Sequence, residues 1–140
     1  LGEDLLLGVP GEADAHFEKT LAYCTALPLT YGHVFPYSRR PGTPAARMSG
    51  QVPGPVRTER AARLRGLVAD KQAEFLRRLA GLDEVRVLVE DASGGRSQYY
   101  APCRFEAPSS APARSLVEAR PVGVDGDRLL VRPVERDSED

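Results

Sequence analysis

The first 36 residues follow the order strand, turn, helix and strand, and this order constrains the fold more than any other feature of the sequence. An apolar run, Leu5 to Leu7, ends at a turn over residues 8–11, and its length suits a strand buried on both faces of a sheet. A helix is expected next, with the acids Glu12 and Asp14 in its first turn, and then a second strand over residues 29–35. The apolar positions of this helix, at helical spacing, are Phe17, Leu21 and Cys24.

A strand–helix–strand unit of this kind requires a right-handed crossover and a parallel sheet. Two strands do not make a stable parallel sheet by themselves, so we expect neighbouring strands upstream of Leu1. The chain also begins without an initiator Met. We therefore interpret it as a fragment, whose first partner is the missing N-terminal portion of the same protein.

The middle of the chain is expected to form a loop and a long helix. Residues 36–55 contain five prolines and three glycines, which predicts a loop. A helix is expected from about residue 56 to residue 80 because apolar side chains recur on one face. Pro55 then lies in its first turn, and Gly81 is expected to provide an αL cap. The apolar residues of this face are Leu64, Val68, Phe75 and Leu79.

After Gly81 the apolar residues recur with a period of two, which is typical of strands. Gly94-Gly95 and Asp125-Gly126 are expected to form turns between these strands. Short alternating strands with glycine and proline between them predict a small antiparallel β-barrel. The expected strands cover residues 85–89, 98–105, 115–121 and 128–134.

The composition excludes several classes of protein. A net charge of −1 over 140 residues argues against a wholly basic nucleic-acid arm, and no apolar run is long enough to span a membrane. Two cysteines are too few for a disulfide scaffold or a four-cysteine cluster site, and they form no ligand spacing with His16 and His33. We therefore expect no metal ligands, and no arrangement of Ser, His, Asp or Cys predicts a catalytic residue.

Charge is concentrated in the middle of the chain. Residues 39–78 carry a net charge of +7, whereas residues 1–27 carry −4 and residues 84–134 are balanced. Such a basic stretch is typical of a segment with an anionic partner such as RNA. The alternative is a solvated helix face, because 17 Arg against two Lys is also what a GC-rich coding sequence produces.

Three groups of residues are candidates for binding. The turn over residues 8–12 precedes a helix N-terminus, where free N–H groups bind anions, or it is a tight turn without a ligand. The loop over residues 35–46 has hydroxyls and two guanidiniums that suit a carboxylate or phosphate, or it is a rigid surface loop. The segment 97–105 interleaves aromatic residues with arginine, which suits RNA, or it is a packed barrel strand.

Three motifs occur in order: DLLLGVPGE at residues 4–12, HVFPYSRRPGTPAA at residues 33–46 and QVPGPVRTERAARL at residues 51–64. Together they resemble the radical-SAM tRNA methylthiotransferases, most closely the branch that adds a 2-methylthio group to N6-threonylcarbamoyladenosine beside the anticodon. The first motif alone is shared with other radical-SAM enzymes. The resemblance extends from residue 1 to residue 82 and, more weakly, to residue 134, and it implies the C-terminal part of a family member.

The resemblance implies a fold class in two parts. Residues 1–82 would be an α/β fragment, the last strand–helix–strand part of a radical-SAM partial barrel with a linker helix. Residues 83–134 would be a TRAM-like antiparallel β-barrel that binds tRNA, and residues 135–140 an acidic tail. A homodimer through the truncated sheet is expected as an artefact, because the fragment exposes a sheet edge.

The same resemblance implies a cytoplasmic enzyme that uses S-adenosylmethionine and [4Fe-4S] clusters. In the family a deoxyadenosyl radical abstracts hydrogen from the adenine, and sulfur and a methyl group are then added. The CxxxCxxC motif of the family is absent from this chain. We therefore expect the chain alone to hold neither cofactor and to be inactive, although the parent protein is an enzyme.

Individual residues match the family's motifs, and three positions, Val9, Arg39 and Tyr99, depart from the family's Phe, Pro and Asn. The residues implied to contact S-adenosylmethionine are Gly8, Pro10, Gly11, Glu12, Ser38 and Arg40. Those implied to contact the substrate or RNA are Tyr37, Thr43, Arg96, Tyr100 and Arg104.

Three other interpretations are open. In the first, the chain is a free-standing RNA-binding module without catalysis. In the other two, it is a fragment of another radical-SAM enzyme or a structural dimerisation fragment. The loop at residues 37–46 argues against another radical-SAM class. The apolar strand Leu5–Leu7, which needs sheet neighbours, argues against a free-standing module.

Overall fold

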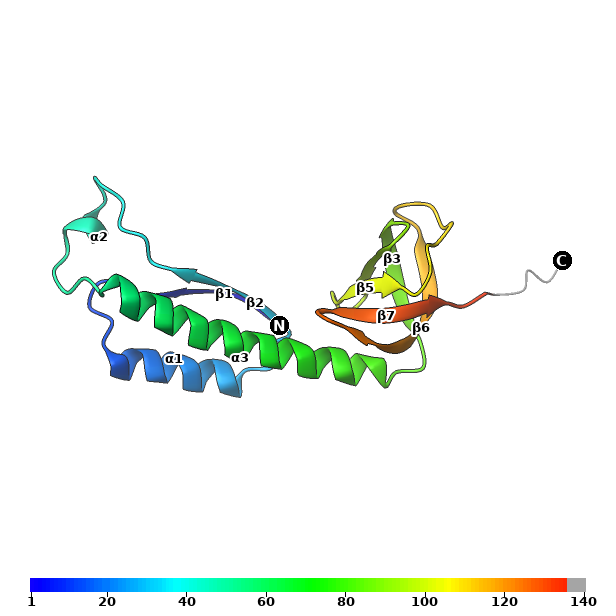
Figure 1. The fold of residues 1–140 in the computed structure, drawn as a ribbon, viewed down its shortest axis with the longest axis horizontal. Helices are drawn as coiled ribbons and strands as arrows, with labels where there is room; N and C mark the ends of the chain where they lie inside the picture. Colours follow the sequence, from blue (N-terminus) through cyan, green and yellow to red (C-terminus); the bar gives the residue numbers. More distant parts are fainter. Residues whose placement is uncertain (136–140) are drawn as a thin grey trace. The chain divides into compact units, whose positions relative to one another are not determined.

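The computed structural model describes residues 1–135, which form two compact units. The first, called the helical unit here, comprises Leu1–Gln72, and the second, the barrel unit, begins at Ala73. Helix α3 (Gly54–Ala80) contributes residues to both units (Figure 1). None of the helices among the described residues is long and apolar enough to cross a membrane.

The helical unit contains the predicted strand–helix–strand arrangement. Strands β1 (Gly2–Leu7) and β2 (Tyr31–Pro36) pair in parallel, from Gly2 opposite Tyr31 to Leu7 opposite Pro36. Helix α1 (Asp14–Ala26) connects them. It ends before Pro28, as predicted, but it begins one residue after Ala13, so Glu12 lies in the preceding turn rather than in the helix.

One face of the two-stranded sheet is covered and the other is open. Leu7 and Val34 point toward α1 and α3 and are buried, whereas their neighbours Leu6 and Phe35 are 60% and 52% exposed. This alternation follows from the period of two along a strand. The buried core of the unit consists of Leu7, Phe17, Cys24, Leu29, Val34, Ala61, Leu64 and Val68.

The loop after β2 contains one short helix, α2 (Pro44–Arg47). Helix α3 begins at Gly54 with Pro55 in its first turn, as predicted. The αL cap predicted at Gly81 is wrong, because Gly81 is not among the glycines with positive φ. Instead the N–H groups of Gly81 and Leu82 donate to the carbonyls of Arg78 and Leu79, which tightens the last turn to a 3₁₀ form.

The barrel unit closes in the order β3-β4-β5-β7-β6. Most neighbours are antiparallel, but β5 and β7 are parallel. The prediction of an entirely antiparallel barrel is therefore wrong, because directions cannot alternate all the way round a ring with an odd number of strands. The strands are β3 (Val85–Asp91), β4 (Gly94–Ser97), β5 (Pro102–Phe105), β6 (Leu116–Asp125) and β7 (Arg128–Pro133).

Two predicted positions within the barrel are corrected. Gly94-Gly95 lies in strand β4, and the turn is instead at Ala92-Ser93, where the Asp91 carboxylate accepts hydrogen bonds from the N–H and the hydroxyl of Ser93. A side chain at Gly94 would collide with the Cys103 carbonyl on β5, so glycine is needed there for close strand approach. The segment 98–101, predicted as strand, is a turn between β4 and β5.

The apolar stripe of α3 serves both units. Leu64 and Val68 pack in the helical unit, while Leu76 and Leu79 are buried under the barrel strands, with Phe75 partly buried beside them. The alternation of Val85, Val87 and Val89, as predicted, places all three in the barrel core.

Candidate functional site

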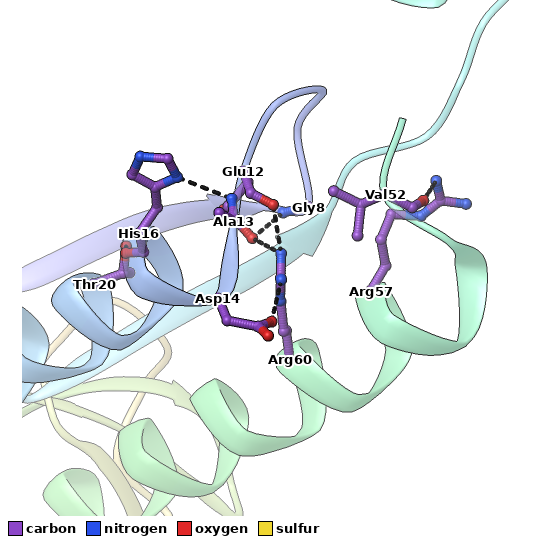
Figure 2. A network of polar contacts seen from close by, with 9 residues as sticks. All are labelled: Gly8, Glu12, Ala13, Asp14, His16, Thr20, Val52, Arg57 and Arg60. Atoms are coloured by element: carbon purple, nitrogen blue, oxygen red, sulfur yellow. Dashed lines mark hydrogen bonds and ion pairs between the residues drawn. The ribbon is translucent and has the colours of Figure 1, made fainter. Parts of the chain in front are cut away.

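The turn between β1 and α1 is the best-defined part of the candidate site (Figure 2). It lies at the carboxyl end of β1, the edge at which parallel sheets bind ligands. Gly8 and Gly11 have φ values of 72° and 86°, a left-handed conformation that side chains disfavour. A Cβ at Gly8 would lie 2.6 Å from Cγ of Arg57, whose guanidinium donates to the Val52 carbonyl at 2.8 Å. Gly8 is therefore required both by its conformation and by the close approach of α3.

Four N–H groups in and next to this turn are engaged within the protein. Gly8 donates to Glu12 Oε1 at 3.0 Å, Gly11 to the Gly50 carbonyl at 2.8 Å, and Glu12 to the Val9 carbonyl at 3.0 Å. Ala13 donates to Nδ1 of His16 at 2.9 Å. These four donors are thus unavailable to an anion, and the tight-turn interpretation describes this backbone better than an anion-binding site does.

Arg60, on α3, holds the turn in place (Figure 2). One nitrogen donates to Oε1 and to the carbonyl oxygen of Glu12 at 2.8 and 3.1 Å, and the other to Oδ1 of Asp14 at 2.7 Å. The Arg60 and Glu12 side chains are 7% and 10% exposed, whereas Asp14 is almost fully exposed. The hydrogen bond to Asp14 raises the pKa of Arg60 most, so the guanidinium stays charged.

Arg60 also stacks on the core of the helical unit. Its guanidinium carbon lies 5.6 Å from the centroid of the Phe17 ring, and that of Arg63 lies 5.3 Å from the same ring. Sequence reasoning missed Arg60 as an individual residue, because one arginine in a basic stretch carries no sign that it is buried. The available signal was the pair of acids, Glu12 at the end of the turn and Asp14 at the start of the helix, close to a basic helix that packs on them.

The loop after β2 begins at the same sheet edge. The N–H of Tyr37 donates to the Leu7 carbonyl at 2.8 Å, which brings Tyr37 beside the Gly8 turn. Ser38 and Arg40 come next along the loop, with exposed side chains. The structure therefore brings the turn and the start of the loop together, as expected for strands that end at one edge.

The end of the loop has a structural role. Thr43 caps α2, because its hydroxyl accepts from the N–H of Ala46 at 3.2 Å and donates to the Arg40 carbonyl at 2.8 Å. Nε of Arg39 donates to the Ala46 carbonyl at 2.9 Å. A shallow pocket beside this part of the loop is lined by Arg39, Pro41, Gly42, Ala46 and Arg47.

Two buried oxygen atoms flank the turn without a hydrogen-bond partner, Oη of Tyr37 and Oε1 of Gln51. The amide nitrogen of Gln51 donates to the carbonyls of Ala45 and Met48 at 2.8 and 3.1 Å, so its oxygen is fixed as an acceptor. Buried polar atoms without a partner in the protein are typical of a site where a ligand supplies the missing hydrogen bonds.

In the barrel unit, Arg96 and Tyr100 lie together and Arg104 has its own partner. The Arg96 guanidinium lies 4.8 Å from the centroid of the Tyr100 ring, and its Nε lies 3.6 Å from Glu90. Nε of Arg104 donates to Asp125 at 2.6 Å. Both arginines are thus paired with carboxylates of the barrel.

The described residues offer no cluster-binding set. They contain no group of three or more His, Cys, Asp or Glu side chains that could hold a metal ion. Cys24 and Cys103 are buried in different units. Burial raises the pKa of the Cys103 thiol to about 11, so it is a packing residue and not a thiolate ligand. A [4Fe-4S] cluster does not fit the side chains of residues 1–135.

The comparisons with known proteins agree with the motifs. The chain is 35% identical over 118 residues to a tRNA-2-methylthio-N(6)-dimethylallyladenosine synthase of Anaplasma phagocytophilum, covering 79% of this chain and 26% of that protein. It is 41% identical over 103 residues to the ribosomal protein uS12 methylthiotransferase RimO of Desulforudis audaxviator, covering 74% and 22%. No family model matches the chain.

A third relative is the threonylcarbamoyladenosine tRNA methylthiotransferase MtaB of Rickettsia prowazekii, 39% identical over 105 residues, covering 75% of this chain and 24% of that protein. The three relatives come from three branches at similar identity, so the threonylcarbamoyladenosine branch is only one of several that match. The chain spans about a quarter of the length of these relatives. The chain therefore belongs to the radical-SAM methylthiotransferase family, as the homologue of one part of its members.

Proposed function

We propose that the chain is the C-terminal part of a radical-SAM methylthiotransferase that adds a 2-methylthio group to a modified adenosine beside the anticodon of tRNA. The observation that carries this proposal is the 35–39% identity to two relatives whose names specify tRNA adenosines. In this proposal the helical unit is the last strand–helix–strand part of the partial barrel, and the mixed β-barrel is the TRAM-like domain.

The turn and the start of the loop would contact S-adenosylmethionine. When cleaved at a cluster held by the rest of the protein, this cofactor supplies the radical that activates the adenosine. The residues proposed here are Gly8, Pro10, Gly11 and Glu12 from the turn and Ser38 and Arg40 from the loop. Because the N–H groups of Gly8, Gly11 and Glu12 are engaged, the contribution of the turn would come mainly from backbone shape and carbonyl oxygens, which suit the cationic ammonium and sulfonium groups of this cofactor.

Arg40 would supply the matching charge for the cofactor's carboxylate, since a guanidinium binds a carboxylate through two parallel hydrogen bonds. Its exposed side chain lies just after Tyr37 in the loop that starts at the same sheet edge. Tyr37 would contact the cofactor or the substrate through its buried hydroxyl. Thr43 would act indirectly, by capping α2 and so shaping the loop.

Electrostatic binding of tRNA would depend on only part of the basic stretch. At least six of its ten cations bind oxygen atoms of the helical unit, namely Arg39, Arg57, Arg60, Arg63, Arg65 and Lys71. Cations that are committed in this way contribute less to binding phosphates. Arg40 is assigned to the cofactor above, so the proposed phosphate contacts are the exposed Arg47, Arg77 and Arg78.

Binding of tRNA to this chain, measured by gel shift between 50 and 200 mM salt, tests the RNA role. Affinity should fall steeply with salt, and Arg47→Gln or Arg78→Gln should lower the salt slope by about one each. Arg63→Gln is the matched control, because Arg63 already pairs with Glu18 at 2.8 Å. Binding that is absent or insensitive to salt would contradict an RNA role.

The enzymatic part of the proposal is tested on the complete protein. The coding region upstream of Leu1 should contain CxxxCxxC in frame, and the complete protein should produce a 2-methylthio nucleoside detectable by mass spectrometry of digested tRNA. A start codon immediately before Leu1 would favour a free-standing RNA-binding module. Modification of ribosomal protein uS12 instead of tRNA would favour the alternative substrate that the RimO relative suggests.

A further inference from the structure

The turn between β4 and β5 is held in one conformation from inside the barrel. The hydroxyl oxygen of Ser97, a residue only 6% exposed, accepts hydrogen bonds from the N–H groups of Tyr99 and Ala101, both at 3.2 Å. The backbone adds two more, Ser97 N–H to the Ala101 carbonyl and Tyr100 N–H to the Ser97 carbonyl, both at 2.9 Å. Four hydrogen bonds thus fix a turn of five residues.

This turn presents two large aromatic side chains to solvent. Tyr99 is 48% exposed and Tyr100 is 60% exposed. Tyr100 has a φ of 63°, a left-handed conformation that is strained for a non-glycine residue. Glycine or asparagine would fit this position with less strain. Packing in the barrel core does not account for a tyrosine there, because its ring is mostly exposed.

The charges around the turn are already balanced. Arg96 lies over the Tyr100 ring and pairs with Glu90 at 3.6 Å, while Arg104 pairs with Asp125 at 2.6 Å. Next to this group is a polar pocket whose lining includes Arg96, Glu90 and the glycine-containing strand β4. The surface therefore offers flat rings and a flat guanidinium, without a marked excess of positive charge.

We infer that this turn is a stacking platform for unpaired nucleobases of RNA. The inference rests on the proposed function and deepens it, since it assigns base contacts to the barrel unit and phosphate contacts to the arginines named above. Every base has a π-face that can stack on tyrosine or on a guanidinium plane, so such a platform tolerates many sequences. Tyr99, which is 48% exposed in the same turn, would add a second ring to the one at Tyr100.

The platform makes two demands on the RNA. Bases must be unpaired, because bases in a duplex are stacked on one another and do not offer their faces. Its contribution should also depend little on salt, because stacking releases no counterions, whereas each phosphate contact does. A loop region of tRNA meets the first demand, and a duplex of the same length does not.

Binding of a single-stranded RNA oligonucleotide and of its duplex to this chain tests the inference. Tyr100→Gly removes the ring, and because glycine suits the positive φ, the turn should keep its conformation. The affinity of this variant for the single strand should fall about tenfold, and the dependence of its affinity on salt should not change. Tyr100→Phe should bind as the original chain does. Tyr23→Ala is the matched control, because Tyr23 is a tyrosine 65% exposed on α1, in the other unit.

Tyrosine fluorescence provides a second readout, since the chain has no tryptophan. Bound single-stranded RNA should quench the fluorescence of the original chain more than that of a Tyr99→Ala, Tyr100→Gly variant. If both tyrosines can be replaced without change in RNA affinity, the platform is excluded while the RNA role stands. If no RNA binds at all, both the inference and the RNA role fail. If replacing the tyrosines lowers the affinity for duplex as much as the affinity for the single strand, only the inference fails.

Discussion

Arg60 shows how a single side chain can determine the shape of a site that it does not itself enter. A buried guanidinium is stable only if its N–H groups find acceptors. Glu12 and Asp14 provide the acceptors, and the Phe17 ring packs against the guanidinium. The same Glu12 oxygen accepts the N–H of Gly8. Helix α3 therefore fixes the turn at the end of β1 through one arginine that pairs with two carboxylates.

Arg60→Met should destabilise the helical unit by about 3 kcal/mol, because it leaves the Glu12 carboxylate buried without its partner. The measurement is urea denaturation followed at amide signals of residues 1–72. A double-mutant cycle with Glu12→Gln should recover part of the loss. The control is Arg63→Met, whose ion pair is half-exposed and should change stability by less than about 1 kcal/mol; equal losses at both positions would contradict this account.

The burial of Arg60 could not be read from the sequence. Charge patterning places arginine on a surface by default, and only the packing of α3 against the turn reverses that expectation. The motif residues of the turn and of the loop start were predictable, because two parallel strands must end at the same edge. Their hydrogen bonds were not predictable, since Gly11 is engaged by Gly50, a residue far along the chain.

At the scale of elements, the period of apolar residues identified helices α1 and α3 and most of the strands, but it missed the short helix α2 and strand β4. Predictions failed where glycine can have either of two structural roles, a left-handed backbone conformation or close contact with a neighbouring strand. Gly94 was expected in a turn and lies in a strand, because its missing side chain allows β5 to approach. Gly81 was expected to adopt a left-handed conformation and does not. Residue type alone does not distinguish a flexible backbone from a crowded one.

Two glycines in open space should respond to alanine with opposite signs. Gly66→Ala lies on an exposed turn of α3 with no atom near the added methyl group, so it should stabilise the chain by about 1 kcal/mol through helix propensity. Gly11→Ala also meets no atom, but φ is 86° there, so it should destabilise by about 1 kcal/mol. Denaturation of both variants measures this, and changes of the same sign would show that the turn or helix conformation is wrong.

At the scale of the molecule, the open face of the β1–β2 sheet is the feature that most affects behaviour in solution. Leu6 and Phe35 lie in register on it, and both are more than half exposed. Exposed apolar side chains beside an open strand edge favour association between chains. The sequence predicted association between chains from the small number of strands in the sheet. It did not predict which side chains lie on the open face.

We expect the chain to form a dimer that dissociates on dilution, measured by light scattering over a range of concentrations. Leu6→Ser should shift the equilibrium to the monomer. Leu116→Ser is the matched control, because Leu116 is 68% exposed on the barrel. A chain that is monomeric at every concentration, or one that responds only to Leu116→Ser, would show that the sheet face is not the contact.

The barrel's odd number of strands has a consequence for how it is connected to the rest of a protein. Successive strands β3 to β7 alternate in direction along the chain, so five crossings carry the backbone from one rim of the barrel to the other. The chain enters at the rim where β3 begins and leaves at the opposite rim, where β7 ends. The points at which the chain enters and leaves the barrel are thereby separated by the full length of a strand.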